Sequence, residues 1–298
     1  MDPAASPVPA ERPLLPDGSR TWVMGILNLT PDSFSDGGRF DRPEAAARQA
    51  QRMLAAGADV LDLGAQSTRP GAAEIGAEAE LERLLPVLRA VRSAHPAALL
   101  SVDTFHAAVA EVALAEGADW LNDVRGGSAL RDPAMAAVVA AAGCPYVLMH
   151  NRGDSRAMDG LAVYEDVMAE VRAELLAATD QLVAAGVSSG RILWDPGLGF
   201  AKTAEQNLVL LRGLDRLAAE GFPLLVGPSR KQFIGTVLEE PRPRARLWGT
   251  AAVCALAVSR GAAVLRVHDV GPIVQTVRMT DALCRQDLRV CSPGAAMA

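Results

Sequence analysis

The sequence predicts an α/β protein that folds as a single-domain (β/α)8 TIM barrel. Three observations carry this prediction. Eight short apolar segments recur along the 298 residues, helical patterns of apolar residues separate them, and the unusual polar residues follow the ends of the apolar segments. A barrel of this type commonly uses about 200 to 250 residues as one domain, so the length suits one large core.

The apolar segments have the length and the Val, Leu and Ile content of buried strands in a parallel sheet. Aromatic residues make up only 4% of the chain, so small aliphatic side chains must form most of the core. The predicted strands span residues 22–29, 60–64, 99–102, 120–124, 146–149, 192–194, 224–227 and 264–267.

Between the strands, apolar residues recur at helical spacing. A glycine closes several of these segments, as at Gly57 and Gly117, and glycine is the residue that most easily takes the left-handed conformation at a helix end. The predicted helices span residues 43–56, 77–91, 107–115, 133–141, 164–185, 207–219, 247–259 and 270–288.

Eight such units and a final helix favour a closed barrel over an open doubly wound sheet. The open sheet would more often use fewer strands and a Gly-x-Gly-x-x-Gly turn, and no such turn follows the first strand. We expect the barrel to span residues 21–288, with flexible tails over residues 1–20 and 289–298.

Composition and charge exclude several functions. The net charge of −6 and the pI near 5.3 provide no general attraction to nucleic acid or to an anionic membrane. The longest uncharged stretch, residues 133–149, is too short to cross a bilayer. The proline-containing start does not resemble a secretory signal, so we expect a cytoplasmic protein. The four cysteines lie far apart, which predicts neither a zinc site nor a disulfide framework.

The loops after the first two predicted strands are long and polar. Residues 28–38 include two adjacent glycines, which suits a loop that closes over a ligand. Ser67, Thr68 and Arg69 follow the second strand, and a guanidinium is the preferred fork for phosphate oxygens. A solvated loop with capping hydroxyls has a similar composition, and this alternative stays open.

Carboxylates and one amide stand at the ends of three further strands, at Asp103, at Asn122 with Asp123, and at Asp195. Because the carboxyl ends of barrel strands share one face, these side chains should converge. Burying an unpaired carboxylate is costly, so such acids are normally kept to bind a donor-rich ligand or to move protons. Alternatively, Asp103 and Asp195 cap the following helices or pair with a neighbouring arginine.

Local positive charge follows the seventh and eighth strands. Only two of the 29 basic residues are lysines, Lys202 and Lys231, and Lys231 stands where barrels often bind phosphate. Arg266 and His268 are two residues apart on a strand, so they should face the same side as an anion clamp. A lone histidine would more often be structural.

Taken together, the strand-end motifs resemble the dihydropteroate synthases of folate biosynthesis, within the pterin-binding barrel superfamily. The resemblance runs from about residue 22 to residue 285. It rests on Met24-Gly-Ile-Leu-Asn-Leu-Thr-Pro-Asp-Ser-Phe-Ser-Asp-Gly-Gly38, Gly64-Ala-Gln-Ser-Thr-Arg-Pro-Gly71, Ser101-Val-Asp-Thr104, Asn122-Asp123, Asp195-Pro-Gly-Leu-Gly-Phe200, Ser229-Arg-Lys231 and Arg266-Val-His-Asp269.

The resemblance implies a transferase that condenses 6-hydroxymethyl-7,8-dihydropterin diphosphate with p-aminobenzoate, giving 7,8-dihydropteroate and diphosphate. It also implies Mg²⁺ as cofactor and a homodimer, with no nucleic-acid or membrane partner. The implied mechanism is dissociative: the C–O bond to diphosphate breaks early, a pterin-stabilised cation forms, and the neutral arylamine attacks it. A pterin edge offers N–H donors to carboxylates and acceptors to an ammonium and an amide, which agrees with the residues present.

The same resemblance assigns the site residues. The pterin would contact Asp103, Asn122, Met149, Asp195, Phe200 and Lys231. The diphosphate would contact Asn28, Arg69, Arg266 and His268, with Asn28 also contacting the metal. The p-aminobenzoate would contact Phe34, Thr68, Arg69, Pro70 and Gln232. The catalytic residues would be Lys231, Asp103, Asp195, Arg266 and His268.

The chain departs from the family pattern at Gln66, Leu198, Ala201 and Gln232, where Glu, Phe, Gly and Ser are usual. Because position 232 borders the aminobenzoate pocket in the family, affinity for aminobenzoate and for the sulfonamides that mimic it can differ from that of typical members.

Three other interpretations remain. A pterin-binding paralogue or a methyltetrahydrofolate-dependent methyltransferase domain shares the pterin half of the site but needs a corrinoid partner, and the chain has no recognisable corrinoid-binding region. A barrel aldolase would use Lys231 for a Schiff base, which leaves the acids unexplained. A non-catalytic scaffold would tolerate alanine at the barrel mouth.

Overall fold

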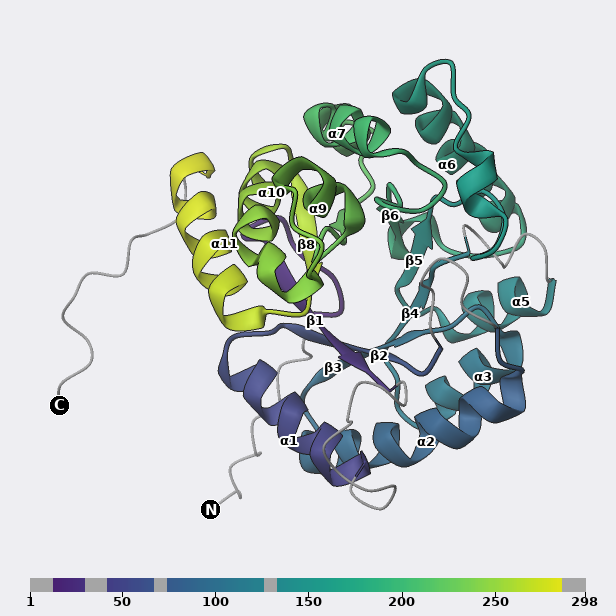
Figure 1. Cartoon of the computed structure of the whole chain (residues 1–298). Helices are drawn as coiled ribbons and strands as arrows, with labels where there is room; N and C mark the ends of the chain where they lie inside the picture. Colours follow the sequence, from purple (N-terminus) through teal and green to yellow (C-terminus); the bar gives the residue numbers. More distant parts are fainter. Residues whose placement is uncertain (1–12, 30–41, 67–73, 126–132, 286–298) are drawn as a thin grey trace, which may run out of the picture.

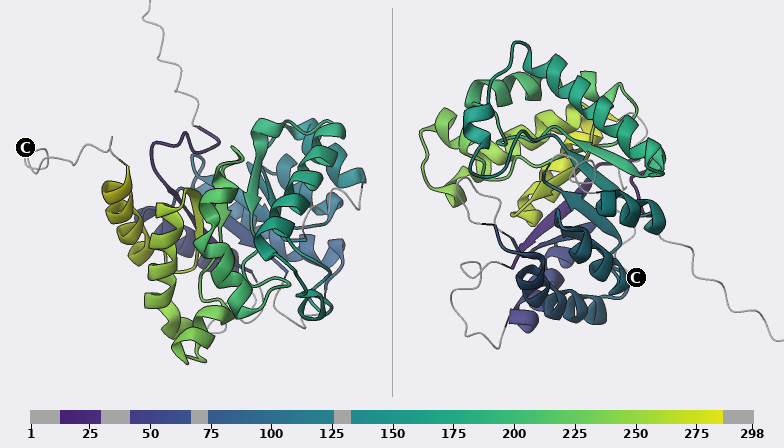
Figure 2. Two further views of the ribbon diagram at one scale, coloured as in Figure 1. Left: turned by 90° about the horizontal axis from the view of Figure 1, so that it is seen from above. Right: turned by 90° about the vertical axis from the view of Figure 1, so that its right-hand side faces the viewer.

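The computed structural model describes residues 13–29, 42–66, 74–125 and 133–285. Its parallel strands form one closed barrel in sequence order, with β1 paired to both β2 and β8. Helices surround the barrel (Figure 1, coloured along the sequence), and Figure 2 shows the same arrangement from two further sides. The predicted (β/α)8 fold is therefore confirmed.

The strands lie close to their predicted positions. They are β1 Trp22–Asn28, β2 Val60–Gly64, β3 Leu99–Asp103, β4 Trp120–Asp123, β5 Tyr146–Met149, β6 Ile192–Asp195, β7 Leu224–Val226 and β8 Ala262–Val267. The helices are α1 Arg42–Ala55, α2 Ala77–Ala94, α3 Ala107–Ala115, α5 Pro133–Ala142, α6 Val167–Ala184, α7 Ala204–Arg212, α8 Leu214–Ala218, α9 Gln232–Leu238, α10 Leu247–Ser259 and α11 Val270–Cys284.

Two helical predictions differ from the structure because of local capping, and one helix was not predicted. The predicted helix 207–219 is divided into α7 and α8 at Gly213, and α7 begins earlier because Thr203 and Gln206 form a capping box. Helix α6 begins three residues later than predicted because the Asp166 side chain accepts hydrogen bonds from the first free backbone N–H groups. Helix α9, only seven residues long, was not predicted.

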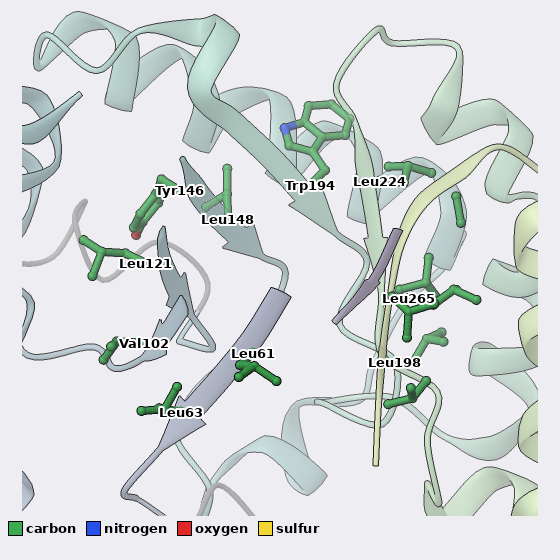
Figure 3. Close-up of a cluster of buried hydrophobic side chains, with 14 of the residues drawn as sticks. Leu61, Leu63, Val102, Leu121, Tyr146, Leu148, Trp194, Leu198, Leu224 and Leu265 are labelled. Carbon is green, nitrogen blue, oxygen red and sulfur yellow. The ribbon is translucent and has the colours of Figure 1, made fainter. Parts of the chain in front are cut away.

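Side chains on each strand alternate between two cores. Those that point outward pack against the surrounding helices, and Figure 3 shows part of this layer, including Leu61, Leu63, Tyr146 and Trp194. Those that point inward fill the barrel at the end where the strands begin. This inner core contains Trp22, Met24, Val60, Leu99, Trp120, Val147, Leu193, Leu225 and Val264.

The apolar inner core closes one end of the barrel. Leu14 and Leu15 pack against it, and the rings of Trp22 and Trp120 stack with their centroids 6.3 Å apart. Residues 1–12 and 286–298 lie outside the described residues, so the predicted domain limits stay a prediction. Each helix within the described ranges is too short or too polar to cross a bilayer. Polar inward-facing side chains are left for the opposite end.

Candidate active site

The next inward-facing position on several strands is polar. Asp62 follows the buried Val60 by two residues, and Asn122 and Arg266 follow Trp120 and Val264 in the same way. Because strand side chains alternate with a period of two, each polar group enters the barrel directly above an apolar one. The carboxyl end of the barrel is therefore the polar end, as the sequence predicted.

One hydrogen-bonded cluster joins strands that are far apart in the sequence. Arg266 Nε donates to Asp62 Oδ2 at 2.6 Å, and Arg266 Nη2 donates to Asp103 Oδ2 at 2.8 Å. Asn122 Nδ2 donates to the same Asp62 oxygen at 3.1 Å. The predicted residues Asp103, Asn122 and Arg266 are thus brought together by Asp62, which the sequence reasoning had not assigned to the site.

Burial controls the charge on the acids of this cluster. It raises the pKa of Asp103 to about 8, with the Arg266 guanidinium acting against the rise and the neighbouring Asp62 carboxylate adding to it. Burial also raises the pKa of Asp195, although the Gly197 N–H donates to its Oδ1 at 2.7 Å and Lys231 opposes the shift. Burial thus outweighs the partners that favour the charged form of each carboxyl group, and N–H donors of a ligand would act in the same direction as those partners.

Lys231 lies directly beside the loop that follows β6. Its Nζ donates to the Leu198 carbonyl at 2.5 Å and lies 4.1 Å from the centroid of the Phe200 ring. Burial lowers the pKa of Lys231 to about 8, while the Asp195 carboxylate opposes the fall. The Lys231 ammonium is therefore a hydrogen-bond donor near two residues that the sequence predicted for the pterin site, Asp195 and Phe200.

An apolar wall faces the charged cluster. Met149 packs with Phe105 and Val124, and Phe200 packs against them. A cavity beside this wall is lined by Phe105, Val124 and Phe200 together with several polar residues, and by no member of the charged cluster. The wall itself offers a flat heterocycle a hydrophobic surface, with Lys231 next to the Phe200 ring.

Asn28, the last residue of β1, lies close to His268, which directly follows β8. Asn28 Nδ2 lies 3.5 Å from His268 Nε2, and the Ser229 hydroxyl lies 3.0 Å from His268 Nδ1. Ser229 also accepts the His268 backbone N–H at 3.2 Å. Ser229 thus fixes the imidazole with Nε2 directed at Asn28.

The loop after β7 is held in an unusual conformation. Arg230 has φ of 61°, in the left-handed region that a bulky residue seldom adopts. Asp269 accepts two hydrogen bonds from its guanidinium, at 3.0 and 2.6 Å, and Arg246 Nη1 donates to its carbonyl at 3.0 Å. Arg246 Nη2 also donates to Gln232 Oε1 at 3.1 Å. These hydrogen bonds fix the backbone of the loop and with it the position of Lys231.

The structure leaves part of the predicted site undescribed. Phe34, Thr68, Arg69 and Pro70 lie outside the described residues. The roles assigned to the remaining predicted residues, including the exposed Gln232, stay predictions. The sequence reasoning also did not assign Lys202 and His150, whose Nζ and Nδ1 atoms lie 2.9 Å apart beside the loop after β6. Asp62 could have been found because it is the one polar residue of its strand and lies at an inward-facing position. Lys202 drew attention only as one of the two lysines of the chain.

The described side chains fit a metal ion that takes most of its ligands from the substrate. No group of three or more His, Cys, Asp and Glu side chains in the described ranges could hold one. Asn28 offers an oxygen donor next to the proposed diphosphate position. Mg²⁺ is often bound through one or two protein oxygens together with substrate phosphates, so this single oxygen fits a substrate-bound Mg²⁺.

Comparisons with known proteins agree with the geometry. A family model described as pterin binding enzyme matches residues 24–268. The dihydropteroate synthase of Synechocystis sp. is 48% identical, over 94% of this chain and 96% of its own length. The structure of Xanthomonas albilineans dihydropteroate synthase in complex with 7,8-dihydropteroate is 40% identical, with a TM-score of 0.80 over 91% of this chain and 96% of that chain.

The structure of Yersinia pestis dihydropteroate synthase in complex with a sulfonamide drug is 41% identical, with a TM-score of 0.83 over 90% of this chain and 95% of that chain. These similarities extend over nearly the whole barrel, including the strand ends that carry the polar cluster. The chain therefore belongs to the pterin-binding enzymes and, within that family, to the dihydropteroate synthases.

Proposed function

We propose that this protein condenses 6-hydroxymethyl-7,8-dihydropterin diphosphate with p-aminobenzoate to form 7,8-dihydropteroate and diphosphate. One observation carries the proposal at the level of residues: acids, an amide, a lysine and an arginine from different strands share one end of the barrel. Arg266 contacts Asp62 and Asp103, and Lys231 contacts the Asp195 loop. Family membership supports the same reaction.

The pterin ring would lie against Met149 and Phe200, with its edge toward the buried polar groups. Asp103 and Asp195 would accept its N–H groups, and Lys231 would donate to its acceptors. Because burial raises the pKa of both acids, hydrogen bonds from the ligand would favour their charged forms. Asn122, already hydrogen-bonded to Asp62, would complete this edge through its amide.

The diphosphate would leave toward Arg266, His268 and Asn28. The C–O bond to the pterin methylene breaks with its electron pair on the diphosphate oxygen. The arylamine nitrogen then forms the C–N bond and loses a proton to water or to the released diphosphate. Arg266 Nη1 makes no hydrogen bond within the described ranges, so it is free to donate to the departing oxygen. Asp103 and Asp195 would stabilise the cationic pterin, which makes preorganised electrostatics the main source of catalysis.

Asn28 Oδ1 is the protein oxygen that we assign to Mg²⁺. When bound, the ion would neutralise part of the charge that develops on the diphosphate. Arg69 would contact the same anion, and Phe34, Thr68, Pro70 and Gln232 would form the p-aminobenzoate pocket as the loops after β1 and β2 close and exclude water.

We also propose a cytoplasmic homodimer. Helices α9, α10 and α11 lie next to one another on one side of the barrel (Figure 1), and they expose large apolar side chains. Trp248 is 80% exposed, and Met279 and Leu283 are 60% and 72% exposed. Apolar surface of this kind suits a protein interface. The unpaired Cys144, Cys254 and Cys284 fit a reducing compartment.

The direct test is a synthase assay. Purified protein is incubated with the dihydropterin diphosphate, labelled p-aminobenzoate and Mg²⁺, and labelled dihydropteroate is measured. We expect product from the unmodified protein, loss of most activity in Lys231→Ala and Asp195→Asn, and loss on chelation of Mg²⁺ that added Mg²⁺ restores. The absence of product from correctly folded, unmodified protein would refute the proposed reaction.

A further inference from the structure

We infer that Lys202 is a positioning residue that holds the loop between β6 and α7 in the shape required to bind the pterin. The inference rests on the proposed function and extends it to a residue that does not itself touch the substrate. All but two of the 29 basic residues are arginine, and both lysines of the chain, Lys202 and Lys231, donate to this one loop.

Lys202 is fully satisfied by acceptors in the interior. Its Nζ donates to Gly197 O at 3.1 Å and to Phe200 O at 3.0 Å, and it lies 2.9 Å from His150 Nδ1. An ammonium has three donors and no acceptor, so His150 Nδ1 must accept the third hydrogen bond. The imidazole proton is then on Nε2, which donates to Glu174 Oε2 at 2.9 Å.

The loop that Lys202 holds also contacts two residues of the site. The Gly197 N–H donates to Asp195 Oδ1 at 2.7 Å, and the Leu198 carbonyl accepts from Lys231 Nζ. Lys202 therefore holds the carbonyl groups of Gly197 and Phe200, while the N–H of the same Gly197 contacts Asp195 and the carbonyl of Leu198, between them, contacts Lys231. A shift of the two carbonyl groups would displace both of the residues that we assign to the pterin.

The loop needs support from outside because its own residues give it little stiffness. Gly197 and Gly199 both have positive φ, 67° and 73°, and glycine restricts the backbone least. A Cβ at Gly197 would lie 1.8 Å from His150 O, and one at Gly199 would lie 2.9 Å from Lys231 Cδ. The loop is thus packed closely between the two lysines, which a larger residue at either glycine would prevent.

The chemistry of this position favours lysine over the arginine that the chain otherwise uses. An ammonium directs its donors from one small centre, whereas a guanidinium is a planar fork suited to paired oxygens. Burial, followed by the charge of Lys202, lowers the pKa of His150 to about 4, so the imidazole remains a neutral acceptor. Burial lowers the pKa of Lys202 to about 7, and the Asp195 charge opposes this fall.

The inference can be tested with Lys202→Met, with Lys202→Arg as the conservative variant. We expect Lys202→Met to lower kcat/KM about 100-fold, mostly through a higher KM for the dihydropterin diphosphate, because small displacements of positioned groups can cost that much. The KM for p-aminobenzoate should change much less. Lys202→Arg should recover part of the loss because it keeps two charge-assisted donors.

Arg92→Met is the matched control. Arg92 is another cation that donates to backbone carbonyl groups, of Pro96, Ala98 and Gly117, but at the opposite end of the barrel. We expect this variant to lower Tm with no change in either KM. A merely structural role for Lys202 would give the same result, and such a result in Lys202→Met would overturn the inference.

A second measurement needs neither substrate nor activity. Lysine labelled with ¹³C and ¹⁵N at the side chain gives signals from only two residues, and the Lys202 variants identify the Lys231 signal. We expect the Lys231 signal and its titration to shift in both Lys202 variants and not in Arg92→Met. An unchanged Lys231 signal in a folded Lys202 variant would overturn the inference. Lack of synthase activity in the unmodified protein would refute the proposed function instead, while this measurement would still decide the link between the lysines.

Discussion

Individual residues at the polar end of the barrel carry charges that water hardly reaches. Asp103 is the most informative of them, because burial raises its pKa to about 8. In the unfolded chain the same carboxyl group titrates near the ordinary aspartate pKa of 3.8. Between these two values the folded state holds a proton that the unfolded state has lost. Stability contributed by this proton is therefore lost as the pH rises through that window.

This linkage makes a prediction for Asp103→Asn. The variant removes the titration and keeps the shape of the side chain, so its stability relative to the unmodified protein should rise steadily between about pH 4 and pH 8. Urea denaturation at several pH values would measure the difference directly. Comparing the two proteins at each pH cancels the contribution of His150 and other groups. A difference that is constant with pH would contradict the assignment.

Ala201 shows local strain at a single residue. It has φ of 46° and is almost completely buried, and the Tyr164 hydroxyl donates to its carbonyl at 3.0 Å. The left-handed conformation costs a residue with a Cβ about 1–2 kcal/mol. Glycine avoids this cost but loses about 0.5–1 kcal/mol through the greater freedom of the unfolded chain.

We therefore expect Ala201→Gly to leave the free energy of unfolding unchanged or to raise it by about 0.5 kcal/mol. The matched control is Ala177→Gly, at an exposed position within α6, which should cost about 1 kcal/mol. Chemical denaturation of the two variants provides the comparison. Equal destabilisation of both would show that Ala201 is not strained.

At the scale of elements, the start of α7 fixes the end of the loop that Lys202 holds. Thr203 Oγ1 accepts the Gln206 N–H at 3.2 Å, and Gln206 Oε1 accepts the Thr203 N–H at 2.8 Å. Asn207, one turn into the helix, accepts the Gly199 N–H at 2.7 Å. The helix and the loop are thus one hydrogen-bonded unit.

Removal of the cap should destabilise this unit. We expect Thr203→Ala to lower the free energy of unfolding by about 1 kcal/mol, because it leaves a backbone N–H at the helix start without its partner. Thr203→Ser keeps the hydroxyl and should retain most of the stability. Thermal and urea unfolding of both variants would test this, and equal losses in the two would exclude the capping box as the cause.

Prediction of the elements succeeded where the local pattern was strong and failed where it was weak. Strand β2 and helices α3 and α10 have their predicted bounds. Helix α9 was missed because its seven residues include Gly235 and carry no extended apolar period. Its start is set by the loop that presents Lys231, so tertiary contacts of Arg246 with that loop stabilise what local propensity does not.

At the scale of the whole molecule, the exposed face of α9, α10 and α11 should decide the oligomeric state. We expect Trp248→Glu to shift the proposed dimer toward monomer, because it places a charge in the most exposed part of this apolar face. Sedimentation velocity would measure the change. Val183→Glu, on α6 away from this face, is the control and should leave the mass unchanged. A monomeric unmodified protein would contradict the dimer.

The sequence by itself determined the order of the strands, the closed barrel and the family. It could do so because strand and helix periods, glycines at helix ends and strand-end motifs are local properties of the chain. The same motifs predicted that five residues lie at one end of the barrel: Asp103, Asn122, Asp195, Lys231 and Arg266.

Only the tertiary structure decided which of these groups touch. Asp62 contacts Arg266 across 204 residues of sequence because closure of the barrel brings inward-facing positions of β2 and β8 to the same level. Lys202 meets His150 across 52 residues for a similar reason, where the loops after β5 and β6 pack together. Such contacts depend on strand register and on the packing of side chains around a common axis, and no local pattern in the chain encodes either.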